Sequence, residues 1–188
     1  MGKNIVVISA SPRKNGNSET LADAFIRGAE EAGNTAEKIC LYDKNIGFCR
    51  GCLSCQKTRR CTIQDDADAI IEKMKQADVL VFATPVYYYE MCGQMKTMLD
   101  RTNPLYGTDY LFRDIYLLAA AAEDDGHAAD GAVQGLSGWI ACYPKSRLAG
   151  VVFCGGVNAA GEIKGNKKLG EAYEMGKNVM GKMFRSKP

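Results

Sequence analysis

Four cysteines in one short segment are the residues of this chain best suited to chemistry. They are Cys49, Cys52, Cys55 and Cys61, and their spacing is C-x2-C-x2-C-x5-C. The first three thiols are spaced three residues apart, and the fourth follows after a short loop. Such an arrangement lets all four thiols bind one small metal centre. Four thiolates are the ligands of a [4Fe–4S] cubane, so the spacing points first to such a cluster and to electron transfer.

Two other interpretations of the cysteine segment stay open. Structural zinc sites usually combine two separated C-x2–4-C knuckles, which makes zinc a weaker alternative. Free or redox-active thiols need no metal at all. Bacterial ferredoxin motifs place a proline after the last cysteine, whereas Thr62 follows Cys61 here. The cluster is therefore the first expectation among three.

A serine- and asparagine-rich stretch, residues 9–18, follows the first apolar run and leads into a helical pattern. The free N–H groups and partial positive charge of a helix N-terminus suit a phosphate. The chain lacks the G-x-G-x-x-G and G-x-x-x-x-G-K-[ST] fingerprints. The stretch therefore fits a terminal monophosphate such as that of FMN, although the same residues also make a plain turn and helix cap. Its candidate binding residues are Ser9, Ser11, Pro12, Arg13, Gly16, Asn17 and Ser18.

An aromatic stretch follows the third apolar run, at residues 84–93. An isoalloxazine ring needs a flat and mostly apolar wall. Pro85 and Val86 offer a rigid backbone for that wall, and Tyr87 or Tyr88 can pack on the ring. An aromatic cluster that covers the sheet end, or a subunit contact, is the alternative.

The loop after the fourth apolar run is expected near the edge of the same ring. Ala121, Ala122 and Glu123 are weaker candidates there. His127, the single histidine, lies in this loop as well, and we expect it to make a local hydrogen bond only. One histidine offers no Ser/His/Asp or Cys/His set, so no side chain is predicted to be catalytic, and a flavin would carry the chemistry.

The remaining sequence predicts the scaffold that brings these segments together. Short apolar runs alternate with helical patterns, which indicates an α/β fold with a parallel sheet and helices on both faces. The expected strands are 5–8, 36–42, 78–84 (ended by Pro85), 114–122 and 148–154; the expected helices are 18–32, 67–76, 93–102, 129–142 and 167–184. Right-handed crossovers favour a doubly wound, flavodoxin-like five-stranded sheet in the order 2-1-3-4-5. Ligands of such sheets bind beyond the carboxyl ends of the strands.

Length and composition limit the remaining possibilities. The chain has 188 residues and a net charge of +2, which fits one domain over 1–188 and gives no reason to expect nucleic acid or membrane as a partner. The cysteine segment is expected as a loop at 47–64. No run approaches the ~18 apolar residues of a membrane span, and no export signal is evident, so we expect a cytoplasmic protein.

With these residues assembled, the chain resembles the NADPH-dependent FMN reductase branch of the flavodoxin-like proteins, and specifically the iron–sulfur flavoproteins. The resemblance covers nearly the whole chain. It is carried by Ser9-Ala10-Ser11-Pro12-Arg13 with Gly16-Asn17-Ser18, the cysteine motif before Asp65-Asp66, Thr84-Pro85-Val86-Tyr87, Gln94-Met95-Lys96 and Leu99-Asp100-Arg101. It implies FMN at the carboxyl edge of the sheet, a homodimer or homotetramer with the flavin near a subunit interface, and electrons passing between ferredoxin, a [4Fe–4S] cluster and FMN.

Three functions are compatible with this reading. The first is an FMN-dependent oxidoreductase with a cluster, which passes electrons between a donor such as ferredoxin and a small-molecule or protein acceptor. The basic residues of the cysteine segment, Arg50, Lys57, Arg59 and Arg60, would attract an acidic ferredoxin, or are simply a solvated loop. The second is a cluster-free NAD(P)H-dependent FMN or quinone reductase. The third is no enzyme but a flavodoxin-like carrier or a zinc-bearing module.

Overall fold

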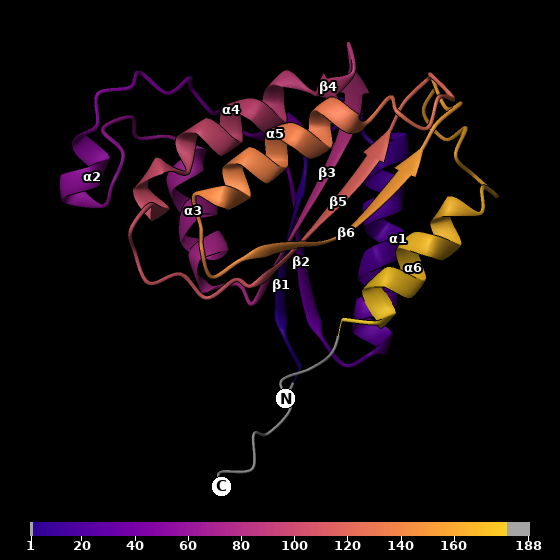
Figure 1. The fold of residues 1–188 in the computed structure, drawn as a ribbon, viewed down its shortest axis with the longest axis horizontal. Coiled ribbons are helices and arrows are strands. Elements are labelled where there is room, and N and C mark those ends of the chain that lie inside the picture. The colour runs from indigo at the N-terminus through magenta and orange to yellow at the C-terminus, as the bar shows by residue number, and fades with distance from the viewer. Residues whose placement is uncertain (1, 180–188) are drawn as a thin grey trace, which may run out of the picture.

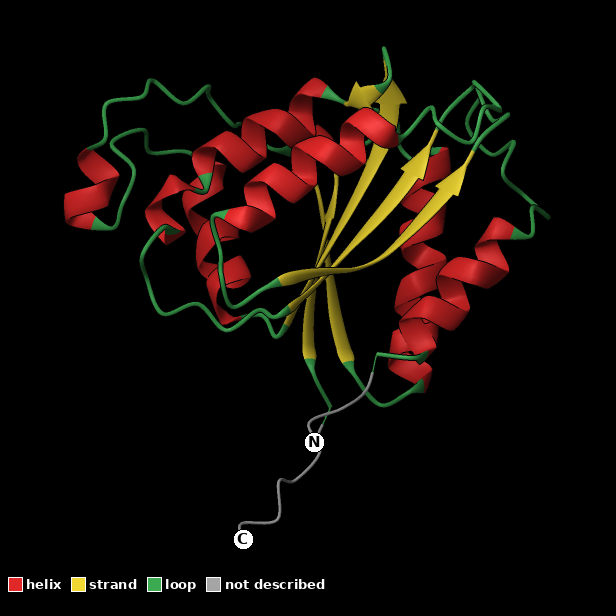
Figure 2. Cartoon of the chain, in the orientation of Figure 1, coloured by secondary structure: helices red, strands yellow, loops and turns green. Residues whose placement is uncertain are grey.

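Runs of buried aliphatic residues form the central strands of a sheet. The structure is a computed structural model that describes residues 2–179. In β1 (Asn4–Ser9) every residue after Asn4 is buried, and in β3 (Val79–Tyr87) burial is continuous as far as Pro85. Strands that are buried on both faces belong to parallel sheets with helices on either side. Figures 1 and 2 show this three-layered arrangement.

Five parallel strands lie in the order β2-β1-β3-β5-β6. In chain order they correspond to the predicted order 2-1-3-4-5, and the arrangement is flavodoxin-like. A sixth strand, β4, was not predicted; it pairs antiparallel with the end of β3. The bounds not yet given are β2 (Thr35–Cys40), β4 (Glu90–Met91), β5 (Asp114–Ala120) and β6 (Arg147–Cys154).

The helices divide between the two faces of the sheet, as expected. The helices are α1 (Asn17–Glu31), α2 (Ser54–Thr58), α3 (Asp66–Gln76), α4 (Gly93–Arg101), α5 (Asp130–Ala141) and α6 (Lys168–Lys177). Helices α1 and α6 cover one face, and α3, α4 and α5 cover the other (Figure 1). A Cβ added to Gly28 would lie 2.0 Å from the Tyr173 carbonyl oxygen, which shows how closely α1 and α6 pack. No helix within residues 2–179 is long and apolar enough to cross a lipid bilayer.

Several boundaries differ from those expected. The second strand ends at Cys40 rather than at 42, because residues 41–43 form a turn of 3-10 helix. Pro85 does not end the third strand, because the return strand β4 pairs with Val86 and Tyr87 and extends β3 beyond the proline. The fourth predicted strand ends at Ala120, where the backbone N–H of Ala121 turns to the carbonyl of Cys154. The last helix ends at Lys177 rather than at 184, and residues 180–184 lie outside the described residues.

The cysteine segment also differs from the expected open loop, because it contains the short helix α2. Leu53 and Arg59 flank this helix with φ of 57° and 59°. These two left-handed residues bend the chain sharply at both ends of α2. In Figure 1 the helix stands away from the three layers, next to the end of α4.

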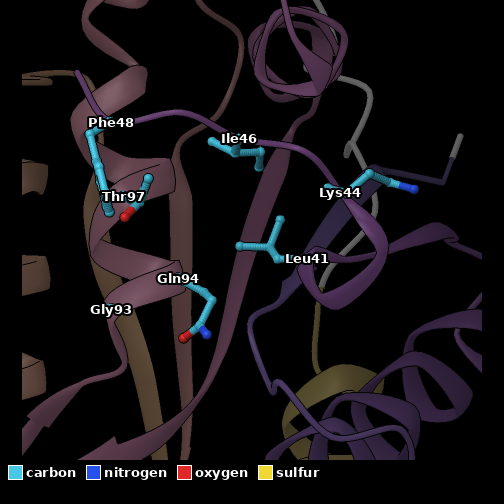
Figure 3. A pocket seen from close by; sticks show the side chains of 7 residues that line it. All are labelled: Leu41, Lys44, Ile46, Phe48, Gly93, Gln94 and Thr97. Atoms are coloured by element: carbon cyan, nitrogen blue, oxygen red, sulfur yellow. The ribbon is translucent and has the colours of Figure 1, made fainter. Parts of the chain in front are cut away.

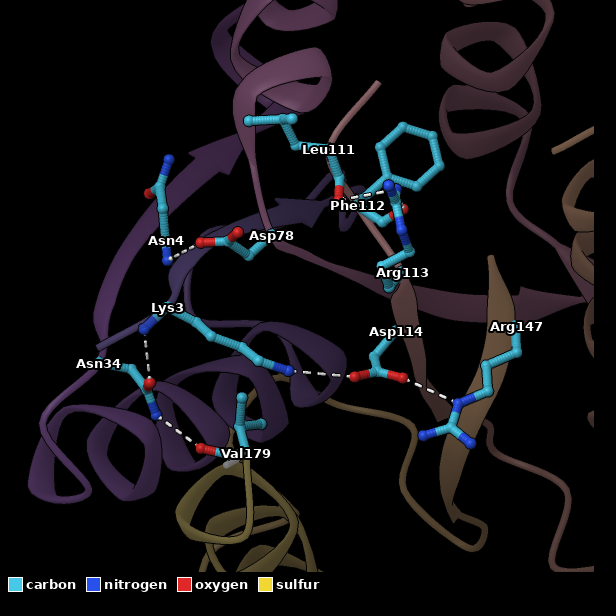
Figure 4. Close-up of polar contacts among 10 residues, drawn as sticks. All are labelled: Lys3, Asn4, Asn34, Asp78, Leu111, Phe112, Arg113, Asp114, Arg147 and Val179. Atoms are coloured by element: carbon cyan, nitrogen blue, oxygen red, sulfur yellow. Dashed lines mark hydrogen bonds and ion pairs between the residues drawn. The ribbon is translucent and has the colours of Figure 1, made fainter. Parts of the chain in front are cut away.

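The amino ends of the strands are joined by a polar network (Figure 4). The Asp114 carboxylate accepts from Lys3 Nζ at 3.1 Å and from Arg147 Nε at 2.9 Å. Asn34 joins the Lys3 backbone N–H to the carbonyl of Val179. Every polar group named here has a partner within the network, so this end of the sheet is structural.

Candidate functional site

A cavity of about 120 Å³ lies at the carboxyl ends of the strands. It collects residues from the predicted loop after β1, from the end of β3 and from the loop after β5. Eight of the predicted binding residues line it, namely Ser11, Arg13, Asn17, Ser18, Pro85, Val86, Tyr87 and Ala122. The structure thus brings together side chains that lie far apart in the sequence.

A second cavity of about 280 Å³ adjoins the first and shares Val86, Ala121 and Ala122 with it. Two further predicted residues, Tyr88 and Glu123, line this second cavity. Together the two neighbouring cavities are called the hollow, which has a polar end at the start of α1 and an aromatic end beside the β3–β4 turn. Its polar and apolar halves match a ligand with one anionic end and one flat ring.

The loop after β1 folds into a tight turn that presents the start of α1. The Ser11 hydroxyl donates to the Arg13 carbonyl at 2.8 Å and accepts from the Arg13 backbone N–H at 3.2 Å. A Cβ added to Gly16 would lie 2.3 Å from Ser11 Oγ, so the turn has no room for a larger residue. Pro12 is exposed, and neither Pro12, Gly16 nor Ser9 lines the hollow.

Two buried hydroxyls at this end lack a partner. Ser9 Oγ and Ser18 Oγ have no hydrogen-bond partner among residues 2–179. An unpaired buried polar group costs about 1–3 kcal/mol. Ser18 lines the cavity, where a phosphate oxygen would satisfy its hydroxyl together with the free N–H groups of the first turn of α1. The residues present therefore fit the phosphate end of FMN.

The side chain of Asn17, which lines the cavity, also makes contacts that the sequence did not predict. Its Nδ2 donates to the Ala159 carbonyl at 2.9 Å, and its Oδ1 accepts from the backbone N–H groups of Gly161 and Ile163 at 3.2 and 3.3 Å. The amide thus holds the loop after β6 against α1.

That loop brings Val157 and Asn158 to the cavity, and neither residue was predicted. The carboxyl end of the fifth predicted strand lies beside that of the fourth. From the sequence, only this neighbouring position of the two strands could have indicated that the loop after the fifth strand also reaches the site.

The β3–β4 turn carries strained backbone beside the hollow. Tyr87 pairs with Glu90, which leaves Tyr88 and Tyr89 as the two turn residues, with φ of 51° and 65°. Two-residue turns with both φ positive usually contain Asn-Gly, because side chains disfavour this conformation. Such strain persists only where the surrounding structure imposes it, and it is common at functional sites.

Cys92 fixes this turn to the loop after β1. Its backbone N–H donates to Thr84 Oγ1 at 3.1 Å, and its Sγ donates to the Ala10 carbonyl at 3.3 Å. Burial raises the pKa of the Cys92 thiol, so the thiol stays protonated and acts as a donor. The two loops that form the hollow are therefore held at a fixed separation.

The four cysteines of the segment differ in environment. Cys49 and Cys52 are exposed, Cys61 is half-buried and Cys55 is buried. Hydrogen bonds from Ser54, and then from Thr62, lower the pKa of Cys52 to about 7. Burial raises the pKa of Cys55, whereas a hydrogen bond from Asn103 Nδ2 to its Sγ, at 3.4 Å, opposes this effect.

No three Cys, His, Asp or Glu side chains within residues 2–179 lie close enough together to hold a metal ion. The convergence of all four thiols on one cluster therefore stays a prediction. The donor set itself, four thiols on one surface loop with arginines and a lysine between them, is chemically suited to an iron–sulfur cluster.

A separate cavity of about 340 Å³ lies where the chain enters the cysteine segment (Figure 3). It is lined by Leu41, Lys44, Ile46, Phe48, Gly93, Gln94 and Thr97, and it shares no residue with the hollow at the strand ends. Phe48, next to Cys49, is 80% exposed at its rim.

His127 is exposed and lines neither cavity of the hollow. Its Nδ1 lies 2.9 Å from Asp130 Oδ2, and its backbone N–H donates to Asp125. This local bonding is what the sequence predicted for it.

A family model for NADPH-dependent FMN reductases matches residues 3–150 of the chain. Iron-sulfur flavoproteins of Methanocaldococcus jannaschii and Archaeoglobus fulgidus are 39% identical over 101 residues and 38% identical over 102 residues. Each match covers 54% of this chain but only 52% and 46% of the relatives, so the chain spans about half the length of the curated relatives it matches. A solved NAD(P)H:quinone oxidoreductase from Methanothermobacter marburgensis has the same fold, with a TM-score of 0.77, 18% identity, and coverage of 97% of this chain and 98% of that one.

Proposed function

We propose that this chain, which belongs to the NADPH-dependent FMN reductase family, is an FMN-dependent oxidoreductase whose flavin lies in the hollow at the carboxyl ends of β1, β3 and β5. The observation that carries the proposal is the buried, unpartnered Ser18 hydroxyl at the polar end of that hollow. When bound, FMN supplies the acceptance and donation of electrons.

The residues of the hollow divide the work of binding between its two ends. At the polar end, Ser18 and the backbone N–H groups of the first turn of α1 receive the phosphate, and Arg13 adds a positive charge at the rim. At the other end, Pro85 and Val86 form one wall of the ring site, and Tyr88 borders it. The backbone beyond β5, at Ala122 and Glu123, lines the opposite side.

We further propose that Cys49, Cys52, Cys55 and Cys61 hold a [4Fe–4S] cluster that exchanges electrons with the flavin. The donor chemistry and the two relatives named iron-sulfur flavoproteins support this assignment. The exposed basic side chains of the segment favour an acidic protein such as ferredoxin as the electron donor; they are Arg50, Lys57, Arg59 and Arg60.

A cluster-free NAD(P)H-dependent FMN or quinone reductase is the second candidate. It is supported by the NADPH in the description of the family and by the quinone oxidoreductase that shares the fold. The two candidates differ in what reduces the bound flavin. Rapid bleaching of the flavin by NADPH alone would favour the second, and bleaching only by reduced ferredoxin would favour the first.

The experiment that tests both cofactor sites compares two variants after anaerobic purification. Cys52→Ser should lose iron and keep FMN, whereas Ser18→Ala should bind FMN more weakly and keep iron. Unchanged iron in Cys52→Ser would overturn the ligand assignment, and unchanged FMN affinity in Ser18→Ala would overturn the phosphate site.

We also propose that the chain assembles as a homodimer or homotetramer. The β3–β4 turn supports this, because Tyr87, Tyr88 and Tyr89 are 42%, 101% and 59% exposed. Large exposed aromatic groups beside a cofactor site are typical of interfaces. Light scattering on the purified protein measures the number of chains directly.

A further inference from the structure

The largest side chain buried completely in residues 2–179 is a charged one, Arg101 at the end of α4. None of its side chain is exposed. A buried guanidinium is costly unless it is paired and hydrogen-bonded. Its partners therefore show what the protein gains by burying it.

Arg101 bonds to both ends of the cysteine segment. Its Nη1 donates to the Gly47 carbonyl at 2.8 Å, and its Nη2 donates to the Ile63 carbonyl at 3.0 Å. Nη1 also donates to Asp65 Oδ2 at 2.6 Å, and the same oxygen accepts from the Gly47 backbone N–H at 2.8 Å. One guanidinium and one carboxylate thus fasten residues 47 and 63, and all four cysteines lie between them.

One nitrogen of the guanidinium has no partner. Arg101 Nε is buried and has no hydrogen-bond partner among residues 2–179. Nη2 bonds to the carbonyl of Ile63, two residues after the half-buried Cys61. A buried positive charge therefore lies close to the last thiol of the motif.

We propose that Arg101 is the positioning residue of the cysteine segment, which closes its two ends at Gly47 and Ile63 and offers its free Nε–H to the Cys61 thiolate. The proposal deepens the proposed function, because it rests on these thiolates holding a redox centre. When the two ends of the segment are fixed, the segment has less conformational entropy to lose as its four thiols bind one cluster. A buried positive charge next to an anionic cluster also raises the reduction potential of that cluster.

The position of Arg101 also relates the two candidate cofactor sites. Helix α4 begins directly after Cys92, which fixes the β3–β4 turn, and ends at Arg101. A nine-residue helix is about 14 Å long and does not bend easily. One rigid element therefore sets the position of the cysteine segment relative to the flavin hollow.

The first test uses the metal-free protein, so that it does not depend on the cluster. In Arg101→Lys the charge remains but the fork that spans Gly47 and Ile63 is lost. We expect backbone amides in residues 47–64 to exchange hydrogen at least tenfold faster, with FMN affinity unchanged. Arg113→Lys is the matched control, because Arg113 also donates to backbone carbonyls, those of Tyr110, Leu111 and Phe112. It should leave the exchange of residues 47–64 unchanged.

The second test separates the effect of the Arg101 charge from the effect of its bonds to Gly47 and Ile63. It follows anaerobic reconstitution with iron and sulfide. Arg101→Lys and Arg101→Met should both retain less iron than the unmodified protein. The cluster that remains should have a more negative midpoint potential in Arg101→Met than in Arg101→Lys, because only the methionine variant lacks the positive charge. A purely structural role would give both variants the same potential.

Unchanged exchange of residues 47–64 in Arg101→Lys, or equal potentials in the two variants, would overturn the proposal. If the unmodified protein takes up no iron, the proposed cluster is wrong, while the exchange experiment still decides the role of Arg101. If the Arg101 variants do not fold, the ¹⁵N resonance of Arg101 Nε–H in the otherwise intact chain replaces them. It should shift in Cys61→Ser and stay in place in Cys142→Ser, and no shift in Cys61→Ser would overturn the proposal.

Discussion

Single side-chain atoms determine how the hollow would fit a flavin phosphate. Ser18 offers a buried hydroxyl without a partner, and Gly16 keeps the turn before it narrow by lacking a Cβ. Neither effect depends on the charge of the site. Both are properties of individual residues, so both can be removed without unfolding the sheet.

Gly16→Ala should weaken FMN binding at least tenfold, or about 1.4 kcal/mol. The new Cβ would lie 2.3 Å from Ser11 Oγ, so Ser11 must rotate and lose its hydrogen bonds to Arg13. Quenching of FMN fluorescence measures the affinity. Gly138→Ala is the control, because its Cβ would meet nothing within 4 Å. Equal FMN affinity in Gly16→Ala and the unmodified protein would show that the turn does not shape the site.

The cysteines should differ in reactivity in the metal-free protein. Hydrogen bonds from Ser54 and Thr62 lower the pKa of Cys52 to about 7, whereas burial raises that of Cys92. Because the thiolate is the nucleophile, the rate of Cys52 alkylation should rise through a midpoint near pH 7, while Cys92 stays unreactive. Ser54→Ala should move the Cys52 midpoint upward. Mass spectrometry of iodoacetamide-treated protein at several pH values measures this, and a Cys52 midpoint near 8.5 would contradict it.

Two elements carry strain or buried charge that their own sequences do not favour. The β3–β4 turn has tyrosines where the geometry favours Asn-Gly, and α4 ends on a buried arginine. Local propensity opposes both features, so each is maintained by its surroundings. Both lie next to a candidate cofactor site, which is where such conflicts are expected.

Replacing the turn with Tyr88→Asn and Tyr89→Gly should raise the free energy of unfolding by about 1–2 kcal/mol, because it relieves two left-handed side-chain positions. FMN affinity should fall, since Tyr88 and Tyr89 border the ring end of the hollow. Urea unfolding measures stability. The matched control is Tyr106→Gly, an exposed tyrosine with φ of −59°, which should lower stability. A loss of stability in the turn variant would mean that the tyrosines stabilise the free chain by contacts.

Asp65→Asn should lower the free energy of unfolding by about 3–5 kcal/mol, because it leaves Arg101 buried and unpaired. The pKa of Asp65 is lowered by the Arg101 bond against the opposing effect of burial. The folded pKa lies below the unfolded one, so this stabilisation is present above about pH 4 and is lost as the pH falls further. Urea unfolding at pH 7 and pH 3 should show a large difference between variant and unmodified protein that shrinks at pH 3.

The control for Asp65→Asn is Asp100→Asn, whose carboxylate meets Lys96 on the surface and should matter little. If both substitutions lower the free energy of unfolding at pH 7 by the same amount, the buried Arg101–Asp65 pair contributes no more than a surface ion pair.

The sequence predicted the elements better than their ends. Continuous β-branched runs such as residues 5–8 identify a buried strand on their own. The prediction that Pro85 ends the third strand was wrong, because the return strand β4 extends β3 beyond the proline, and β4 consists of only two residues. The contacts of Asn17 were not predictable for a similar reason: the partners of its amide come from residues 159–163, and no local pattern shows that contact. Arg101 was noticed as part of a motif, but its burial depends on Gly47 and Ile63, which only the fold brings to it.

At the scale of the molecule, the two ends of the sheet are built for different purposes. The amino ends are closed by paired charges around Asp114, whereas the carboxyl ends hold unpartnered hydroxyls, strained tyrosines and a hollow. The cysteine segment lies at the far end of α4 from the β3–β4 turn. The candidate flavin hollow and the cysteine segment therefore lie at opposite ends of one rigid helix.

One measurement tests most directly whether the chain holds both FMN and a cluster. The visible spectrum of anaerobically purified protein should be recorded, with FMN, iron and acid-labile sulfide counted per chain. We expect about one FMN, with about four irons and four sulfides held by the cysteine segment. Protein that contains iron but takes up no FMN would contradict the flavin site. Protein that binds FMN but takes up no iron on anaerobic reconstitution would contradict the cluster and leave a flavin reductase.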